Sequence, residues 1–164
     1  MTVSRAIGAY DGTLGALIHA LKYEGRRSLG RPLARLMVQA GAELLESADI
    51  ATPVPLHRSR ALERGFNQSE ILARRLGVPV LLALRRTRRT PSQTDLPAAK
   101  RHANVRGAFA MARGVTVDGK VVVLVDDVST TGATLEACAA VLLEAGAREV
   151  RALTAARVVS RRQQ

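Results

Sequence analysis

Hydrophobic positions recur along this chain at two different spacings, and the two spacings predict alternating helices and strands. Apolar residues at the i, i+3, i+4 and i+7 spacing of an amphipathic helix come early in the chain: Leu14, Leu17, Ile18 and Leu21. Asp11 is a suitable N-cap for this helix, and Gly25 is a suitable stop. Further helices are expected from about Pro32, over residues 67–76 and over residues 133–145.

Uninterrupted apolar runs predict the strands. The strongest run covers residues 121–125 and is typical of a strand that is buried on both faces. Further strands are expected over residues 49–56, 80–84 and 150–159. Strands that alternate with helices predict an α/β fold with a parallel, twisted sheet flanked by helices. Ligands bind beyond the carboxyl ends of such strands, so the loops after Val54 and Val125 should share one rim.

Residues 85–106 break this pattern. They contain seven Lys or Arg residues, one acid and two prolines, with no sustained periodicity. This composition predicts a flexible basic loop or hairpin arm. We expect a single domain over residues 1–164 that carries this arm.

Composition limits the class of protein. The 164 residues are 47% hydrophobic, which is enough for a folded core. No apolar run reaches the ~20 residues of a membrane span, and no signal-peptide core follows the N-terminus. Cys138 is the only cysteine, so an internal disulfide and a cysteine metal cluster are excluded. We therefore expect a cytoplasmic protein without a membrane span, in which Cys138 packs as a small apolar residue.

The net charge of +11 favours polyanionic partners such as nucleic acid or pyrophosphate, although compositional drift toward arginine is an equal alternative. Only four aromatic residues are present, which argues against a surface that stacks the bases of a single strand. Single-stranded DNA and a second copy of this chain stay open as partners.

Two acids and a hydroxyl-rich turn follow the strongest strand. After Asp126 and Asp127 come the residues of the turn, Ser129, Thr130, Thr131, Gly132, Ala133 and Thr134, and then a helix begins. Backbone N–H groups at a helix N-terminus attract a phosphate, and the carboxylates can accept hydrogen bonds from ribose hydroxyls. The alternative is an ordinary capped helix, but a plain turn needs neither two acids nor four hydroxyls.

This segment resembles the phosphoribosyl pyrophosphate (PRPP) signature of type I phosphoribosyltransferases. Residues 54–68 resemble the ComF family of competence-associated phosphoribosyltransferase-like proteins. So do Gln93 and Thr94, together with a later group: Arg101, Asn104, Val105, Arg106, Gly107, Ala108 and Phe109. The three segments occur in the order of the family.

The resemblance implies a role for each segment. It assigns Asp126 and Asp127 to the ribose hydroxyls and, through ribose or water, to Mg²⁺. It assigns the turn at 129–134 to the 5′-phosphate. It assigns the segment after the first core strand to pyrophosphate, with these candidates: His57, Arg58, Ser59, Arg60 and Arg64. Arg101 is the favoured contributor from the arm, which would close over PRPP.

Several of these residues have a second interpretation. His57 could be a general acid or base, although a structural hydrogen bond is the commoner role. The arginines of this segment could line a solvated approach to the next helix. Phe66 and Asn67 are expected to fix the turn into that helix, and Phe109 is expected to pack in the core.

Two functions follow from the resemblance. The first is Mg²⁺-dependent transfer of phosphoribosyl from PRPP to an unknown acceptor. The second is a non-catalytic accessory protein that binds PRPP or a nucleotide during DNA uptake or processing. ComF-like proteins usually carry a cysteine-rich, zinc-binding module before the position of Tyr10, and this sequence has none there. Either the start is truncated or this member lacks the module. Asp95 also replaces a glycine that is frequent after the Gln-Thr pair.

Overall fold

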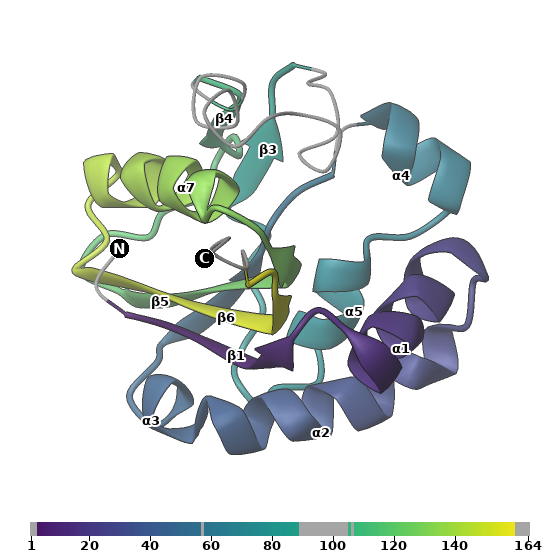
Figure 1. The fold of residues 1–164 in the computed structure, drawn as a ribbon. Helices are drawn as coiled ribbons and strands as arrows, with labels where there is room; N and C mark the ends of the chain where they lie inside the picture. The colour runs from purple at the N-terminus through teal and green to yellow at the C-terminus, as the bar shows by residue number, and fades with distance from the viewer. Residues whose placement is uncertain (1–2, 57, 89–104, 106, 160–164) are drawn as a thin grey trace, which may run out of the picture.

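The computed structural model describes residues 3–56, 58–88, 105 and 107–159. Four parallel strands form the central sheet in the order β1-β6-β5-β2. Their bounds are β1 (Ser4–Ala9), β2 (Ile50–Pro53), β5 (Val121–Ser129) and β6 (Glu149–Arg157). Helices cover both faces of the sheet (Figure 1). The predicted parallel α/β fold is confirmed.

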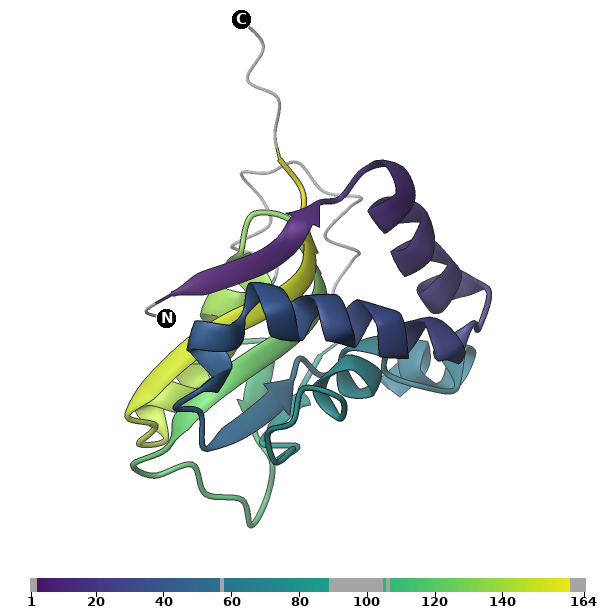
Figure 2. The same ribbon diagram turned by 90° about the horizontal axis from the view of Figure 1, so that it is seen from below.

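The helices are α1 (Gly12–Tyr23), α2 (Gly30–Ala40), α3 (Ala42–Leu45), α4 (Arg58–Arg64), α5 (Gln68–Ala73) and α7 (Ala133–Glu144). A single 3-10 turn, η1 (Arg27–Leu29), joins α1 to α2. Helix α7 lies on one face of the sheet, whereas α1, α2, α3 and α5 lie on the other (Figure 1). Figure 2 shows α2 lying across that second face.

The central strand β5 supplies both halves of the core. Side chains alternate between the faces of a strand, and the strand's apolar run has no polar position. Val122 and Leu124 therefore pack toward α7, whereas Val123 and Val125 pack toward α1, α2 and α5. All four are fully buried. Cys138 of α7 is buried in the first of these clusters, as the sequence predicted.

The predicted first helix is confirmed. Ile18 and Leu21 are fully buried against the sheet. Helix α2 begins at Gly30, two residues before the expected Pro32. A Cβ atom at Gly30 would collide with the side chain of Ile71, so glycine permits the close approach of α2 to α5.

The structure differs from the predicted elements in three places. Strand β1 was not predicted, because a half-exposed edge strand lacks a strong apolar run. Residues 80–83 do not form a strand; within them only Val80 makes a bridge, an isolated one to Ala51. The strand lies instead at β3 (Leu84–Arg86), antiparallel to β4 (Phe109–Met111). The first residues of the predicted flexible arm are therefore paired, and 89–104 and 106 lie outside the described residues.

Strand β5 is longer than predicted and contains both acids. The strand was expected to end before Asp126, but its pairing with β6 continues to Ser129. Pairing with β2 ends earlier, at Pro53 and Val125. A proline is tolerated there because β2 is an edge strand. Both acids thus lie where β5 keeps β6 but has lost β2, which opens one side of the strand to other groups.

No helix within the described ranges is long and apolar enough to cross a membrane.

Candidate functional site

A pocket opens at the carboxyl end of the sheet, beside the two acids. It is lined by the end of β5, the turn that follows, the loop after β2, and parts of α1 and α4. Its volume is about 170 Å³, whereas a single water needs roughly 10–15 Å³. The loops after β2 and β5 do share this rim, as the topology of a parallel sheet predicts.

The hydroxyl-rich turn forms one wall of the pocket. Gly132 is the N-cap of α7 and has a φ of 83°, a left-handed conformation that side-chain-bearing residues rarely adopt. Five of the six predicted turn residues line the pocket: Ser129, Thr130, Gly132, Ala133 and Thr134. Thr131 instead lines a neighbouring hollow, which also includes Arg5 and Arg157. The N-terminal end of α7, which attracts anions, therefore lies at the pocket.

Asp126 is held by two donors at the end of β5. Its Oδ1 atom accepts from Ser69 Oγ at 2.9 Å and from the backbone N–H of Asp127 at 2.9 Å. Burial of the carboxyl and the nearby charge of Asp127 raise the pKa of Asp126 to about 7. Its carboxyl group therefore changes protonation near neutral pH.

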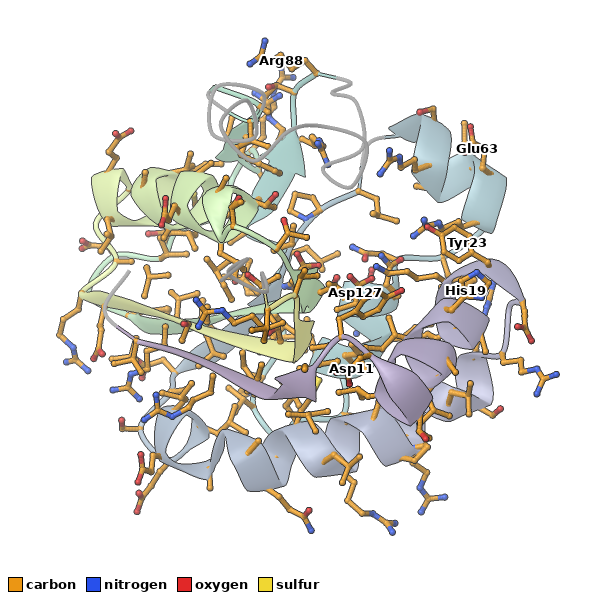
Figure 3. All side chains as sticks on the ribbon, in the orientation of Figure 1. Asp11, His19, Tyr23, Glu63, Arg88 and Asp127 are labelled. Atoms are coloured by element: carbon orange, nitrogen blue, oxygen red, sulfur yellow. The ribbon has the colours of Figure 1, made fainter. Side chains whose placement is uncertain are left out.

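Asp127 is paired with a lysine from the other end of the chain. Lys22 Nζ lies 2.8 Å from Asp127 Oδ1, and the two side chains are 15% and 5% exposed. Figure 3 shows Asp127 between the end of β5 and α1. Burial tends to lower the pKa of Lys22, but the charge of Asp127 and the hydrogen bond to it prevail, so that pKa is raised. The pair is therefore ionic, with both charges largely removed from water.

The second carboxylate oxygen of Asp127, Oδ2, is buried and has no hydrogen-bond partner among the described residues. Lys22 was not among the predicted site residues. One signal was present, because Lys22 follows Ile18 by four residues and so continues the buried face of α1. A lysine on that face implies a buried anionic partner.

The candidate cations come from α4 and β3. The segment expected to be a loop is helix α4, which begins at Arg58. Arg60 and Arg86 line the pocket, and Arg86 was not among the predicted site residues. Burial and the positive charge of Arg60 lower the pKa of Arg86. Two guanidinium groups that repel each other at a pocket wall favour a bound anion.

Arg64 also lines the pocket, but it is engaged by protein groups. Its Nη1 donates to Gln68 Oε1 at 3.2 Å, and its guanidinium lies 4.9 Å from the centre of the Tyr23 ring. Figure 3 shows Tyr23 between α1 and α4. Ser59 lies in α4 and does not line the pocket. His57 and Arg101 lie outside the described residues.

Asn67 fixes the turn into α5, as predicted. Its Oδ1 accepts from Ser69 N at 3.0 Å, and its Nδ2 donates to Val54 O at 3.0 Å. Phe66 lies under the guanidinium of Arg27, at 4.7 Å. The capping contact therefore places Ser69, the partner of Asp126, beside the loop that leaves β2.

The described residues contain no group of three or more His, Cys, Asp or Glu side chains that could hold a metal ion. A metal at the described part of this pocket therefore needs oxygens from a ligand or from water in addition to the carboxylates.

Comparisons with known proteins agree with the geometry. Residues 62–164 match the phosphoribosyl transferase domain family. The chain is 34% identical to the DNA utilization protein YhgH of Escherichia coli O157:H7, over 88% of this chain and 67% of that protein. It is 33% identical to competence protein F of Haemophilus influenzae, over 88% of this chain and 68% of that protein.

A solved structure described as the allosteric regulatory enzyme of purine biosynthesis is also similar. The TM-score is 0.50 and the identity 32%, over 78% of this chain and 25% of that one.

Proposed function

Because the chain belongs to the phosphoribosyltransferase domain family, and within it to the ComF group of competence-associated proteins, we propose that it binds PRPP in the pocket at the end of β5. One observation supports this most strongly. The acidic pair, the turn at the N-terminus of α7 and two arginines all line the same pocket. Each matches one part of PRPP: ribose, 5′-phosphate and pyrophosphate.

The 5′-phosphate is assigned to the turn. Gly132 has no Cβ to obstruct the anion, and the N-terminal end of α7 carries the partial positive charge that attracts it. The hydroxyls of Thr130 and Thr134 stand at the same wall of the pocket. A sugar phosphate bound there directs its ribose toward Asp126 and Asp127.

Pyrophosphate is assigned to Arg60 and Arg86. Both line the pocket, from α4 and β3. A bound pyrophosphate relieves the repulsion between the two guanidinium groups and forms charge-assisted hydrogen bonds. Arg64 holds Tyr23 and Gln68, so we assign it to the support of this wall.

The donor set fits Mg²⁺ only in the company of a ligand. Two carboxylates are present, and one oxygen of Asp127 is buried without a partner among the described residues. These groups would hold the ion through ribose hydroxyls or water. When bound, the ion supplies positive charge to the leaving pyrophosphate.

The reaction that fits is transfer of the phosphoribosyl group. The bond between the anomeric carbon and pyrophosphate breaks, and a new bond forms between that carbon and a nucleophilic atom of the acceptor. The arginines neutralise the leaving group, and the acidic pair holds the ribose hydroxyls in place. The acceptor is unknown.

Thermal unfolding with PRPP tests the proposal. A ligand that binds only the native state stabilises it by RT ln(1 + [L]/Kd), about 2.7 kcal/mol at a hundredfold excess over Kd. We expect PRPP and ribose 5-phosphate to raise the melting temperature and ribose to leave it unchanged. No shift with PRPP at millimolar concentration, with or without Mg²⁺, refutes the assignment.

A second candidate function is nucleic-acid binding. A hollow on the outer surface of α2 is lined by Arg31, Arg35, Val38 and Arg75. No ion pair of the described residues includes any of these three arginines. Three unneutralised arginines around one hollow favour a phosphate backbone. This hollow and the acidic pocket share no lining residue, so the two candidate functions do not exclude each other.

A further inference from the structure

Lys22 is a buried cation at the acidic pair, and it comes from outside the part of the chain that matches the family. The match covers residues 62–164, whereas Lys22 is in the last turn of α1. Its ammonium forms the 2.8 Å ion pair with Asp127, and both residues line the pocket. Asp127 has the same orientation on β5 as Val123 and Val125, which pack with Ile18 and Leu21 of α1. The fold therefore directs this carboxylate toward α1.

The ion pair changes the charge that a ligand meets. An ionised carboxylate at the bottom of a pocket repels phosphate and pyrophosphate, and the repulsion grows as water is excluded. A divalent cation that arrives with the ligand is one way to offset this charge. Lys22 supplies positive charge at the same place, and this charge belongs to the protein itself.

We propose that Lys22 acts as a built-in cation, which offsets the charge of Asp127 and lets the pocket bind an anionic phosphoribosyl ligand without a divalent ion. This inference rests on the proposed function, because it concerns the same pocket. The inference separates binding from transfer. PRPP binding tolerates the loss of Mg²⁺, whereas the departure of pyrophosphate can still depend on the ion.

Contacts of the residues after Lys22 hold the end of α1 in place. The next residue, Tyr23, is contacted by the guanidinium of Arg64, and Arg27 Nη2 donates to Gly65 O at 3.3 Å. These contacts connect the end of α1 and η1 to the end of α4 and the residues after it. The end of α1, which carries Lys22, is thus connected to α4 by contacts outside the ion pair, and the Lys22 side chain, 15% exposed, lines the pocket.

Calorimetric titration of PRPP with the whole chain, once in EDTA and once in excess Mg²⁺, tests the inference. The readout is the ratio of the two dissociation constants, which a uniform loss of structure does not change. Lys22→Met keeps an unbranched side chain, one atom shorter, but leaves the acids with one more net negative charge. Lys22→Arg keeps the charge. Lys120→Met is the matched control, because it removes the same charge immediately before the opposite end of β5.

Lys22→Met leaves the buried Asp127 without its ammonium partner, and an unpaired buried charge destabilises the fold. A double variant, Lys22→Met with Asp127→Asn, is therefore included. The double variant restores the formal charge of the wild-type site. If charge balance is the role of Lys22, the double variant keeps a wild-type ratio even when its affinity is lower in both buffers.

We expect wild type, Lys22→Arg and Lys120→Met to bind PRPP in EDTA within about tenfold of their affinity in Mg²⁺. Lys22→Met should lose a further ten- to hundredfold in EDTA, as roughly expected for a charged contact. Wild-type binding that vanishes in EDTA overturns the inference and leaves the proposed function intact. So does an equal ratio in wild type and Lys22→Met. Wild-type protein that binds PRPP in neither buffer refutes the proposed function itself.

Discussion

Ser69 Oγ donates a 2.9 Å hydrogen bond to Asp126 Oδ1 and so joins the first turn of α5 to the end of β5. Ser69 is buried, and its own backbone N–H donates to the N-cap residue Asn67. The bond opposes the effect of burial, because a donor to the carboxylate lowers the pKa of Asp126. Burial and Asp127 nevertheless prevail and raise that pKa to about 7.

The first prediction is a pH dependence of stability. The folded protein keeps the proton of Asp126 up to pH of about 7, whereas the unfolded chain releases it near 3.8. The folded state thus binds more protons between these values, and the free energy of unfolding falls as pH rises through them. The slope from this one group is at most about 1.4 kcal/mol per pH unit. Urea unfolding of wild type and Asp126→Asn at a series of pH values isolates the contribution of Asp126 to this slope.

Asp126→Asn should therefore gain stability relative to wild type as the pH rises toward 7. Ser69→Ala should extend the dependence to higher pH, because it removes a donor to the carboxylate. Parallel stability curves for wild type and Asp126→Asn would contradict the raised pKa.

The second prediction concerns the acidic pair. Asp126→Asn and Asp127→Asn keep the shape of each side chain and remove a charged acceptor for a ribose hydroxyl, which contributes roughly 1.5–3 kcal/mol. Calorimetry with PRPP and Mg²⁺ above pH 7, where the Asp126 carboxyl has passed its raised pKa, should show this loss of affinity in each variant. Asp11→Asn is the control, because Asp11 is exposed and its side chain does not cap α1. Unchanged affinity in both variants would remove the ribose assignment.

The third prediction concerns the turn before α7. Gly132→Ala places a side chain at a φ of 83° and should cost about 1–2 kcal/mol of stability. It should also shift the turn and weaken binding of ribose 5-phosphate. Gly119→Ala is a matched control, because Gly119 has a φ of 67° and open space around it. The two variants should lose similar stability, and only Gly132→Ala should lose affinity. Equal affinity in both would exclude the turn as the phosphate site.

The fourth prediction tests the hollow on α2. The affinity for single-stranded DNA should fall with salt, by about 0.7 logarithmic units per contacted phosphate. Replacing Arg31, Arg35 and Arg75 together by Ser should lower this slope by about two.

A control variant removes three positive charges elsewhere: Arg113, Lys120 and Arg148. It should change the slope less than the hollow variant does. An equal change in both triple variants would indicate a general effect of net charge. Wild-type protein that fails to bind DNA at low salt would refute the second candidate function, nucleic-acid binding.

Local pattern was enough to predict three of the four strands of the central sheet and its principal helices. The run at 121–125 predicted a doubly buried strand, and the spacing of Leu14, Leu17, Ile18 and Leu21 predicted α1. Both signals are strong because burial on one side of a helix, or on both sides of a strand, fixes residue type position by position. Edge strand β1 and short strand β3 carry little such signal, because they are short or half-exposed.

The candidate site was predictable where its residues are consecutive. Asp126, Asp127 and the turn up to Thr134 form one segment, and the order of strand, acids and helix places them at the end of the sheet. The length of β5 was not predictable from that segment, because its extension to Ser129 depends on pairing with β6. Helix α4 likewise replaced an expected loop, since an arginine-rich stretch fits a solvated helix as well as a loop.

The sequence by itself thus determined the parallel α/β fold, the chemistry of the turn and the place of the acids at one rim. Only the tertiary structure decided which groups those acids meet. Lys22, Ser69 and Arg86 come from three different elements, and each reaches the site through the packing of its helix or strand. A polar residue in a local pattern shows no sign of its partner, because the contact is between segments that are distant along the chain. The charge state of the pocket is therefore a property of the fold.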